Sequence, residues 1–196
     1  MSSPDESRIP TQYECTEQLV QTTPADGLIV SNLGVSSWIL SKVEDRDRNY
    51  YMKGAMGSTT PMGLGMALGT NAPVTVIDGD GSMLMSLGAL ATVARESPEN
   101  LTIVVMDNSE FKTTGGQPTL AADASFHDVA RSCGLRSHSV SSRDEFETAY
   151  ESAIDSTETV LISCAVTSSV PEEYPRPDYS HSYLKHRFRS AIVEGE

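Results

Sequence analysis

The sequence has little cysteine, and the few residues present are not arranged for metal binding. Three cysteines occur in 196 residues, at positions 15, 133 and 164. They are odd in number and far apart, and no two of them form a CxxC pair. This pattern argues against a zinc ribbon and against an iron–sulfur cluster held by cysteines. We expect reduced thiols, with Cys164 as core filler in a strand.

Lysine is also scarce, and the charge balance is strongly acidic. The chain has 14 basic residues, only four of them lysine, against 27 Asp and Glu, and its formal net charge is -13. Nonspecific nucleic-acid binding needs a basic face, so we exclude that class of function. An acidic excess with little lysine suits a cytosol of high salt, because carboxylates stay hydrated while salt screens their repulsion. A halophilic source is therefore weighed against an ordinary acidic protein.

Long hydrophobic runs are missing as well. The longest, such as residues 101–106, have the length of a strand and are too short to cross a bilayer. The first ten residues contain no basic stretch followed by an apolar core, so we expect no signal peptide and a cytoplasmic protein. A length of 196 residues with 38% hydrophobic residues suits one globular domain with a real core.

Apolar runs and helical spacings alternate along the chain, which predicts strands alternating with helices. Near-continuous apolar strands are typical of a parallel sheet covered on both faces, so the expected fold is a three-layer α/β/α arrangement around a mainly parallel sheet. The expected strands are 27–32, 74–78, 101–106, 136–140 and 160–166. The expected helices are 11–22, 34–42, 82–95, 126–133 and 143–155, with another beginning near Pro61. Residues 43–51 are interpreted as a surface connection.

The glycines in GLGMALG at 63–69 prompt a dinucleotide-binding alternative. Their spacing is GxGxxxG, one residue longer than the dinucleotide fingerprint, and no buried strand directly precedes them. Helix packing explains them better. The helix near Pro61 is expected to bury three large apolar side chains and to pack closely through its glycines, and these residues are Met62, Met66, Leu68, Gly63, Gly65 and Gly69.

Oxygen-bearing side chains directly follow two of the predicted strands. Asp80 lies in a GDG turn after the strand 74–78, and Asn108 follows the strand 101–106, 108 − 80 = 28 residues further on. In parallel sheets ligands bind beyond the carboxyl ends of the strands, so we expect Asp80 and Asn108 to meet there. Mg²⁺ prefers such oxygen ligands, and the carbonyl of Glu110 offers a third.

The turn around Asp80 also suits an anion. The backbone amides of Gly81 and Ser82 stand at the start of the next predicted helix, where N–H groups and the helix-end field favour negative charge. A bare GDG is more often an ordinary turn. Combined with the strand-final Asn108, it predicts a cradle for a divalent metal and a diphosphate.

This pattern resembles the thiamine diphosphate motif, which opens with GDG and ends about as far downstream with a pair of residues, the second being Asn. Asp107 replaces the first residue of that pair, and the ligand Asn108 is kept. GAMG at 54–57 resembles the segment that holds the aminopyrimidine, which implies the Gly54 carbonyl as its acceptor and Met56 as the support of the bent cofactor. SNLGVSS at 31–37 resembles the segment near the diphosphate. The cofactor-binding residues implied are Gly54, Met56, Gly57, Ser58, Gly79, Asp80, Gly81, Ser82, Asn108 and Ser36, with Asn32 beside them.

Within this superfamily, residues 27–190 resemble sulfopyruvate decarboxylase beta subunits and phosphonopyruvate decarboxylases. The segments that carry the resemblance are GSMLMSLGALATVARESPENL, TGGQPT and KHRF. It implies thiamine diphosphate, Mg²⁺ and non-oxidative decarboxylation of a 2-oxoacid that bears a second anion. Lys112, Thr113 and Thr114 are then expected substrate contacts, with Lys112 facing that anion; a solvated surface lysine is the alternative.

The resemblance also implies a missing half. These enzymes activate the cofactor with a glutamate on a separate pyrimidine-binding domain, and no glutamate of this chain is assigned to that role. We therefore expect a pyrimidine-binding, alpha-type partner subunit in a hetero-oligomer built on dimers. The expected division is a tail and short helix (1–24), a thiamine diphosphate-binding domain (25–170) and a proline-rich extension with a short helix (171–196).

Two alternatives to the decarboxylase subunit stay open at this point, and a third is set aside. An acetolactate synthase-like carboligase subunit shares the cofactor motif and stays open. A non-catalytic cofactor-binding or regulatory subunit is the other open alternative, although Asp80 and Asn108 are intact. The beta subunit of a 2-oxoacid:ferredoxin oxidoreductase would usually bring cluster cysteines, and the three here lack that spacing.

Overall fold

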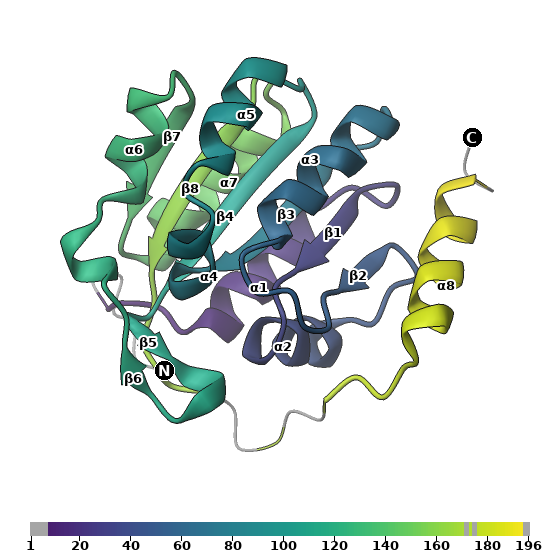
Figure 1. Cartoon of the computed structure of the whole chain (residues 1–196), viewed down its shortest axis with the longest axis horizontal. Coiled ribbons are helices and arrows are strands. Elements are labelled where there is room, and N and C mark those ends of the chain that lie inside the picture. Colours follow the sequence, from purple (N-terminus) through teal and green to yellow (C-terminus); the bar gives the residue numbers. More distant parts are fainter. Residues whose placement is uncertain (1–7, 171–172, 174–175, 194–196) are drawn as a thin grey trace, which may run out of the picture.

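The computed structural model describes residues 8–170, 173 and 176–193 and has a three-layer α/β/α fold (Figure 1). A six-stranded sheet runs in the order β2-β1-β3-β4-β8-β7, and all neighbouring strands are parallel. Its strands are β1 (Leu28–Ser31), β2 (Asn49–Tyr51), β3 (Val74–Gly79), β4 (Leu101–Asp107), β7 (Arg136–Val140) and β8 (Val160–Ala165). The predicted fold class is confirmed.

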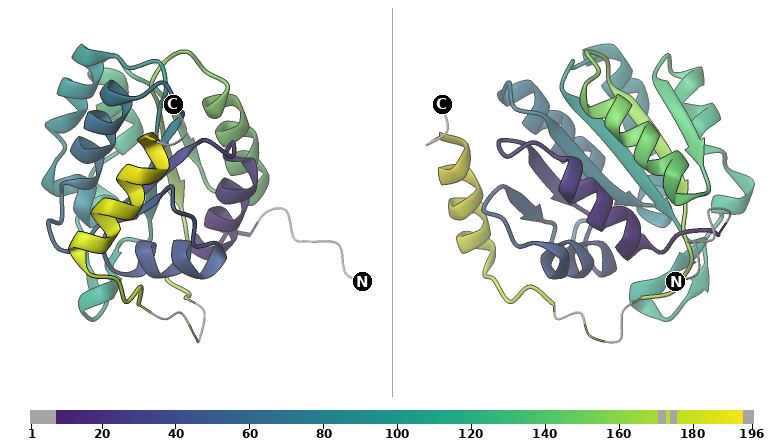
Figure 2. Two further views of the ribbon diagram at one scale, coloured as in Figure 1. Left: turned by 90° about the vertical axis from the view of Figure 1, so that its right-hand side faces the viewer. Right: turned by 180° about the vertical axis from the view of Figure 1, so that it is seen from behind.

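Helices cover both faces of the sheet, as Figure 2 shows from the side and from behind. One face carries α1 (Gln12–Thr22), α2 (Val35–Val43) and α7 (Arg143–Ile154). The other carries α3 (Thr59–Gly69), α4 (Asp80–Met85), α5 (Ala89–Glu96) and α6 (Phe126–Ser132). Helix α8 (His181–Val193) lies at the sheet edge beside β2. Among the described helices, none is long and apolar enough to span a membrane.

The core has two halves, one on each face of the sheet. Successive side chains of a strand point to opposite faces, and β4 shows this alternation. Val104 and Met106 join the cluster beneath α1 and α7, whereas Ile103 and Val105 join the cluster beneath α3, α5 and α6. All four are almost completely buried, as expected for a central parallel strand.

Helix α1 belongs to this core. It begins with a capping box, in which Thr11 and Glu14 satisfy each other's backbone N–H groups. Cys15 and Leu19 on its inner face are completely buried. The Cys15 sulfur lies 3.7 Å from that of Cys164 in β8, where Cys164 fills the core as predicted. The helix thus packs into the domain that follows it, and residues 1–7 of the predicted tail lie outside the described residues.

Two predictions of local structure were wrong. Residues 49–51 were expected in a surface connection but form the edge strand β2, parallel to β1. The strand is held because Tyr51 is buried and the Asn49 side chain donates a 2.8 Å hydrogen bond to the Glu44 carbonyl. The helix expected at 82–95 is broken after Met85, and α5 begins only at Ala89.

The buried face of α3 also differs from the expected one. Met62 and Leu68 are exposed, and the helix instead faces the sheet through Gly63 and Leu64. A Cβ atom on Gly63 would lie 2.1 Å from Val76 Cγ2, so only glycine permits this contact between α3 and β3. Gly65, on the outer side, has no neighbour within 4 Å of where its Cβ would be. Gly69 has no such neighbour either, so close packing through a glycine is confirmed at Gly63 and not at Gly65 or Gly69.

Candidate functional site

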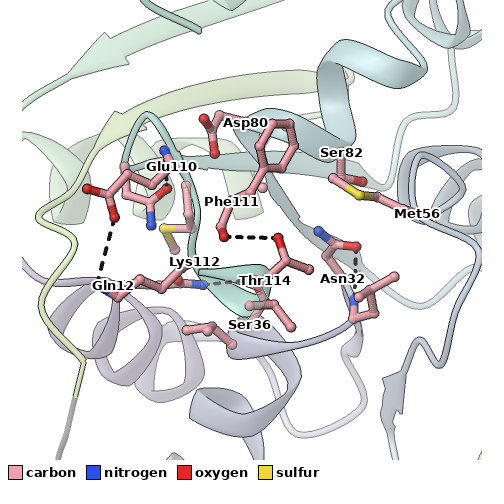
Figure 3. A pocket seen from close by; sticks show the side chains of 17 residues that line it. Gln12, Asn32, Ser36, Met56, Asp80, Ser82, Glu110, Phe111, Lys112 and Thr114 are labelled. Atoms are coloured by element: carbon pink, nitrogen blue, oxygen red, sulfur yellow. Dashed lines mark hydrogen bonds and ion pairs between the residues drawn. The ribbon is translucent and has the colours of Figure 1, made fainter. Parts of the chain in front are cut away.

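The site lies where the order of the sheet changes direction. The chain leaves β1 toward β2 on one side, whereas β3 and β4 follow on the other side of β1. In open parallel sheets the crevice beyond the strand ends at such a point receives ligands. A cavity of about 120 Å³ lies there, which we call the site cavity (Figure 3).

Most of the predicted site residues line this cavity. They are Asn32, Ser36, Met56, Gly79, Asp80, Gly81, Ser82, Asn108, Glu110, Lys112, Thr113 and Thr114. The lining residues that sequence reasoning missed are Gln12, Leu33, Val35, Met106 and Phe111. Gly54, Gly57 and Ser58 do not line it, and Gly54 instead borders an adjoining cavity.

Asp80 is a buried carboxylate without a cationic partner. Its exposed fraction is 3%, and the Thr119 hydroxyl donates a hydrogen bond to its Oδ2 atom. Burial raises the pKa of the Asp80 carboxyl; the Thr119 hydrogen bond offsets part of this, and the Asp107 carboxylate raises it further. No Lys or Arg of the described chain forms an ion pair with Asp80. A buried charge of this kind calls for a cation, so the site fits a bound metal ion.

Asn108 and Glu110 lie at the same rim, on the loop that leaves β4. The Asn108 Oδ1 atom accepts a 3.1 Å hydrogen bond from the Glu110 N–H. In the described part of the chain, no three or more His, Cys, Asp or Glu side chains are grouped so that they could hold a metal ion. One carboxylate, one amide oxygen and one carbonyl oxygen would fill only part of the coordination shell of a metal ion. Mg²⁺ commonly binds proteins in this way and takes its remaining ligands from phosphate groups and water.

The turn at Asp80 is fixed by its glycine neighbours. A Cβ atom on Gly81 would lie 2.3 Å from Phe111 Cε1, so glycine lets the aromatic ring close over the turn. A Cβ atom on Gly79 would approach Asn32 Nδ2 at 3.3 Å. Behind the turn, the buried Asp78 accepts hydrogen bonds of 3.0 Å from Thr60 Oγ1 and from the Gly79 N–H. These contacts lock the backbone that presents Asp80.

The segment 54–57 is tied to that turn from the other side. Gly54 and Gly57 have φ angles of 72° and 83°, which favour glycine, and Ala55 shares this region at 54°. The Gly57 N–H donates a 3.0 Å hydrogen bond to Ser82 Oγ. This bend places Met56 in the cavity wall, next to Ser82 (Figure 3).

The loop after Asn108 folds back on itself and returns to Asp80. Its antiparallel strands are β5 (Glu110–Phe111) and β6 (Gln117–Pro118), joined through Gly115 and Gly116. The Thr119 N–H then donates a 2.9 Å hydrogen bond to the Ser109 carbonyl, which places the Thr119 hydroxyl on Asp80. Sequence reasoning missed Thr119, although a Gly-Gly pair between short extended segments is a hairpin signal.

Two further side chains of the wall have partners in the protein. Lys112 Nζ lies 3.7 Å from Glu110 Oε2, so its positive charge is partly offset. Ser36 Oγ accepts a 2.9 Å hydrogen bond from Gln12 Nε2, which joins α1 to the site. Gln12 and Ser36 are 24 residues apart, and only the packing of α1 on α2 brings them together.

A buried acid and an amide beyond neighbouring strands of a parallel sheet place the site where α/β proteins bind their ligands. The comparisons with known proteins identify the family. Residues 34–164 match the model described as "Thiamine pyrophosphate enzyme, C-terminal TPP binding domain". The chain belongs to this family, as its sequence predicted.

Its relatives include two kinds of decarboxylase. A phosphonopyruvate decarboxylase from Streptomyces viridochromogenes is 40% identical over 185 residues, 94% of this chain and 47% of that protein. A sulfopyruvate decarboxylase subunit beta from Methanocaldococcus jannaschii is 36% identical over 184 residues, 93% of this chain and 97% of that subunit. The chain thus spans about half the length of the first protein and nearly all of the second.

The fold has solved counterparts. The crystal structure of benzoylformate decarboxylase from Polynucleobacter necessarius matches with a TM-score of 0.73, covering 87% of this chain and 36% of that chain. The two sequences are 23% identical, so this likeness speaks for the fold alone.

Proposed function

We propose that the chain is the diphosphate-binding, beta-type subunit of a thiamine diphosphate- and Mg²⁺-dependent 2-oxoacid decarboxylase. The proposed substrate is an anionic 3-substituted pyruvate such as sulfopyruvate or phosphonopyruvate. The observation that carries the proposal is the buried carboxylate of Asp80, which lines one cavity with Asn108 and forms no ion pair with a described Lys or Arg. The chain also matches a sulfopyruvate decarboxylase beta subunit over nearly the whole length of that subunit. A cytoplasmic location stays a prediction of the sequence.

In this proposal each part of the site holds one part of the cofactor. Asp80, Asn108 and the carbonyl of Glu110 would hold Mg²⁺, and the ion would offset the negative charge of the diphosphate. The diphosphate is held by the backbone around Gly79, Gly81 and Ser82 and by Ser36, whereas Gly54, Met56, Gly57 and Ser58 hold the aminopyrimidine end. Thiamine diphosphate supplies an electron sink for cleavage of the bond to the carboxylate. The protein contributes position and a dry, charged environment.

Lys112, Thr113 and Thr114 are the proposed substrate contacts of this chain. All three line the site cavity on the loop between β5 and β6. The hydroxyl of Thr114 already bonds to the Phe111 carbonyl and to the Gln117 side chain, at 3.3 and 3.2 Å. Its loop is therefore held in place before a substrate arrives, which lowers the entropic cost of binding.

The proposal requires a second chain or domain. A pyrimidine-binding, alpha-type partner would supply the activating glutamate and the rest of the substrate pocket, at an interface across the site cavity. The half-length match to the phosphonopyruvate decarboxylase supports this division. A carboligase subunit and a non-catalytic cofactor-binding subunit remain the alternatives.

Reconstitution tests the proposal. The chain is purified alone and with the partner that co-purifies from its source, and both samples are given Mg²⁺, thiamine diphosphate and a panel of 2-oxoacids. We expect no CO₂ release from the chain alone and turnover of anionic 3-substituted pyruvates by the complex. Robust turnover by the isolated chain would refute the division of labour. A product that joins two substrate molecules through a new carbon–carbon bond, in place of an aldehyde, would favour the carboligase alternative.

A further inference from the structure

A second, larger cavity adjoins the site cavity. Its volume is about 300 Å³, and we call it the Trp38 cavity after the indole in its wall. Leu33 and Thr113 line both cavities, so the two spaces share a wall. Gly34, with a φ of 74°, gives Thr113 the room to stand there, because a Cβ atom at Gly34 would lie 2.2 Å from Thr113 Oγ1.

The Trp38 cavity is lined by cations in a strongly acidic chain. Lys53 and Arg176 line it, and no Asp or Glu does among the residues that the structure describes. The Arg176 guanidinium lies 5.0 Å from the centre of the Trp38 ring, and Lys53 Nζ donates a hydrogen bond to the Tyr179 carbonyl. Within the described residues, neither cation forms an ion pair with a carboxylate. Although the net charge of the chain is -13, two cationic side chains without an ion-pair partner among the described residues line this one cavity.

This arrangement suits a small oxyanion. A guanidinium stacked on an aromatic face keeps its N–H edge free for two parallel hydrogen bonds to an oxyanion, and a lysine adds a point charge. Lys112, by contrast, already faces Glu110 at 3.7 Å. The stronger attraction for a second negative group therefore lies in the Trp38 cavity.

We propose that the Trp38 cavity binds the second anionic group of the substrate, a sulfonate or phosphonate, through Lys53 and Arg176. The inference rests on the proposed function, because it assigns this group to a substrate that reacts in the site cavity. A 2-oxoacid then lies across the shared wall, with its reacting carbon on the site-cavity side of Thr113 and its terminal anion beside Trp38. Lys53 and Arg176 determine specificity and take no part in bond cleavage.

Trp38 provides a binding signal that needs no turnover. It is the single tryptophan of the sequence, so the intrinsic indole fluorescence of the full chain reports on this cavity. We expect a saturable fluorescence change on titration with ethanesulfonate or methylphosphonate. Lys53→Gln and Arg176→Gln should each weaken the binding about tenfold, as expected for loss of a charged partner, and the double variant should weaken it further.

A matched control removes the same charges elsewhere. Lys185 and Arg189 are exposed on α8, and the double variant Lys185→Gln, Arg189→Gln should bind these probes like the parent chain. Equal weakening in this control, or unchanged binding in the Lys53 and Arg176 variants, would overturn the inference. Thermal melting of every variant separates lost binding from lost folding.

Kinetics of the complex with its partner then test whether the anion bound in the Trp38 cavity is part of the substrate or a free oxyanion. Lys53→Gln and Arg176→Gln should raise KM about tenfold for sulfopyruvate or phosphonopyruvate relative to pyruvate. Unchanged specificity, with the fluorescence response still lost, would overturn the assignment to the substrate and leave a site for a free oxyanion. A complex that decarboxylates no 2-oxoacid, with the fluorescence titration intact, would refute the proposed function and not the anion site.

Discussion

The environment of the Asp80 side chain fits the cation that we propose it binds. Its carboxylate is buried, and the Thr119 hydroxyl holds one of its oxygens. Groups that hydrogen-bond to a metal ligand fix its orientation, and their loss typically weakens metal binding. Thr119 is itself held by its N–H bond to the Ser109 carbonyl, so its hydroxyl cannot drift from Asp80. We infer that Thr119 orients the carboxylate and does not touch the metal.

A series at these two residues tests this role. Thr119→Val removes the hydroxyl at nearly constant volume and should raise the dissociation constant for Mg²⁺, measured by calorimetry with thiamine diphosphate present, by roughly 10–100-fold. Thr119→Ser keeps the hydroxyl and should stay close to the parent chain. Asp80→Ala should abolish Mg²⁺-dependent binding of the cofactor. Unchanged cofactor affinity in Asp80→Ala would reject the metal site.

The residues that sequence reasoning found and missed differ in a physical respect. Asp80 and Asn108 follow strands directly, so strand prediction was enough to place them together. Thr119 and Phe111 reach the turn only through the β5–β6 fold-back, and Gln12 only through helix packing. Contacts of this kind depend on tertiary geometry, which no local pattern specifies.

At the scale of elements, α8 is fastened to the sheet edge by Arg187. Its guanidinium forms a 3.0 Å ion pair with Asp45 and donates to the carbonyls of Arg46 and Asn49, at 3.2 and 3.3 Å. Its guanidinium carbon also lies 4.8 Å from the Tyr179 ring centre. The side chain is only 7% exposed. One residue thereby closes the edge of β2, which would otherwise be open to pairing with another strand.

The ion pair should make the docking of α8 depend on pH. Burial raises the pKa of Asp45, but hydrogen bonds from Tyr179, Tyr51 and Arg187 outweigh it and leave that pKa below its ordinary value. A lowered folded-state pKa adds stability above the unfolded pKa of about 3.9, and this stability is lost as pH falls through the folded value. Unfolding free energy should thus fall more steeply below about pH 4 in the parent chain than in Asp45→Asn.

Chemical denaturation between pH 3 and 6 measures this difference. We expect Asp45→Asn to cost about 1 kcal/mol at neutral pH, which is less than a buried charged hydrogen bond contributes, because solvent reaches Asp45. Arg187→Met should cost more, since it also loses its carbonyl partners and its ring contact. Parallel pH curves for the parent chain and Asp45→Asn would contradict the assignment.

The predicted strands with long apolar runs are confirmed, whereas a three-residue strand and a break within a long predicted helix were missed. The buried strands β3, β4 and β8 carry enough apolar residues to be read from sequence, and their bounds moved by one residue or less. Strand β2 has three residues, too few for a period to show. The break between α4 and α5 follows from Ser86, whose N–H bonds to the Met83 carbonyl and tightens the last turn.

For the molecule as a whole, the net charge of -13 destabilises the folded state, because like charges repel one another in a compact chain. Salt shortens the range of that repulsion, from about 10 Å at 0.1 M to about 3 Å at 1 M. The melting temperature should therefore rise as KCl increases over this range. A variant with Asp144→Asn and Glu151→Gln, both exposed on α7, should show a smaller rise. A flat or falling melting temperature would argue for an ordinary acidic protein over a halophilic one.

The pairing of β3 with β4 has a consequence for the accuracy of assembly. Asp78 pairs with Val105 and Gly79 with Met106. Two of the proposed metal ligands follow this ladder closely, Asp80 by one residue and Asn108 by two. A slip of one residue would turn every core side chain of β4 toward the opposite layer, where it does not fit. The apolar core thus fixes the relative positions of the proposed metal ligands. A chain in which these strands are paired in the wrong register is destabilised by poor core packing, independently of the cofactor.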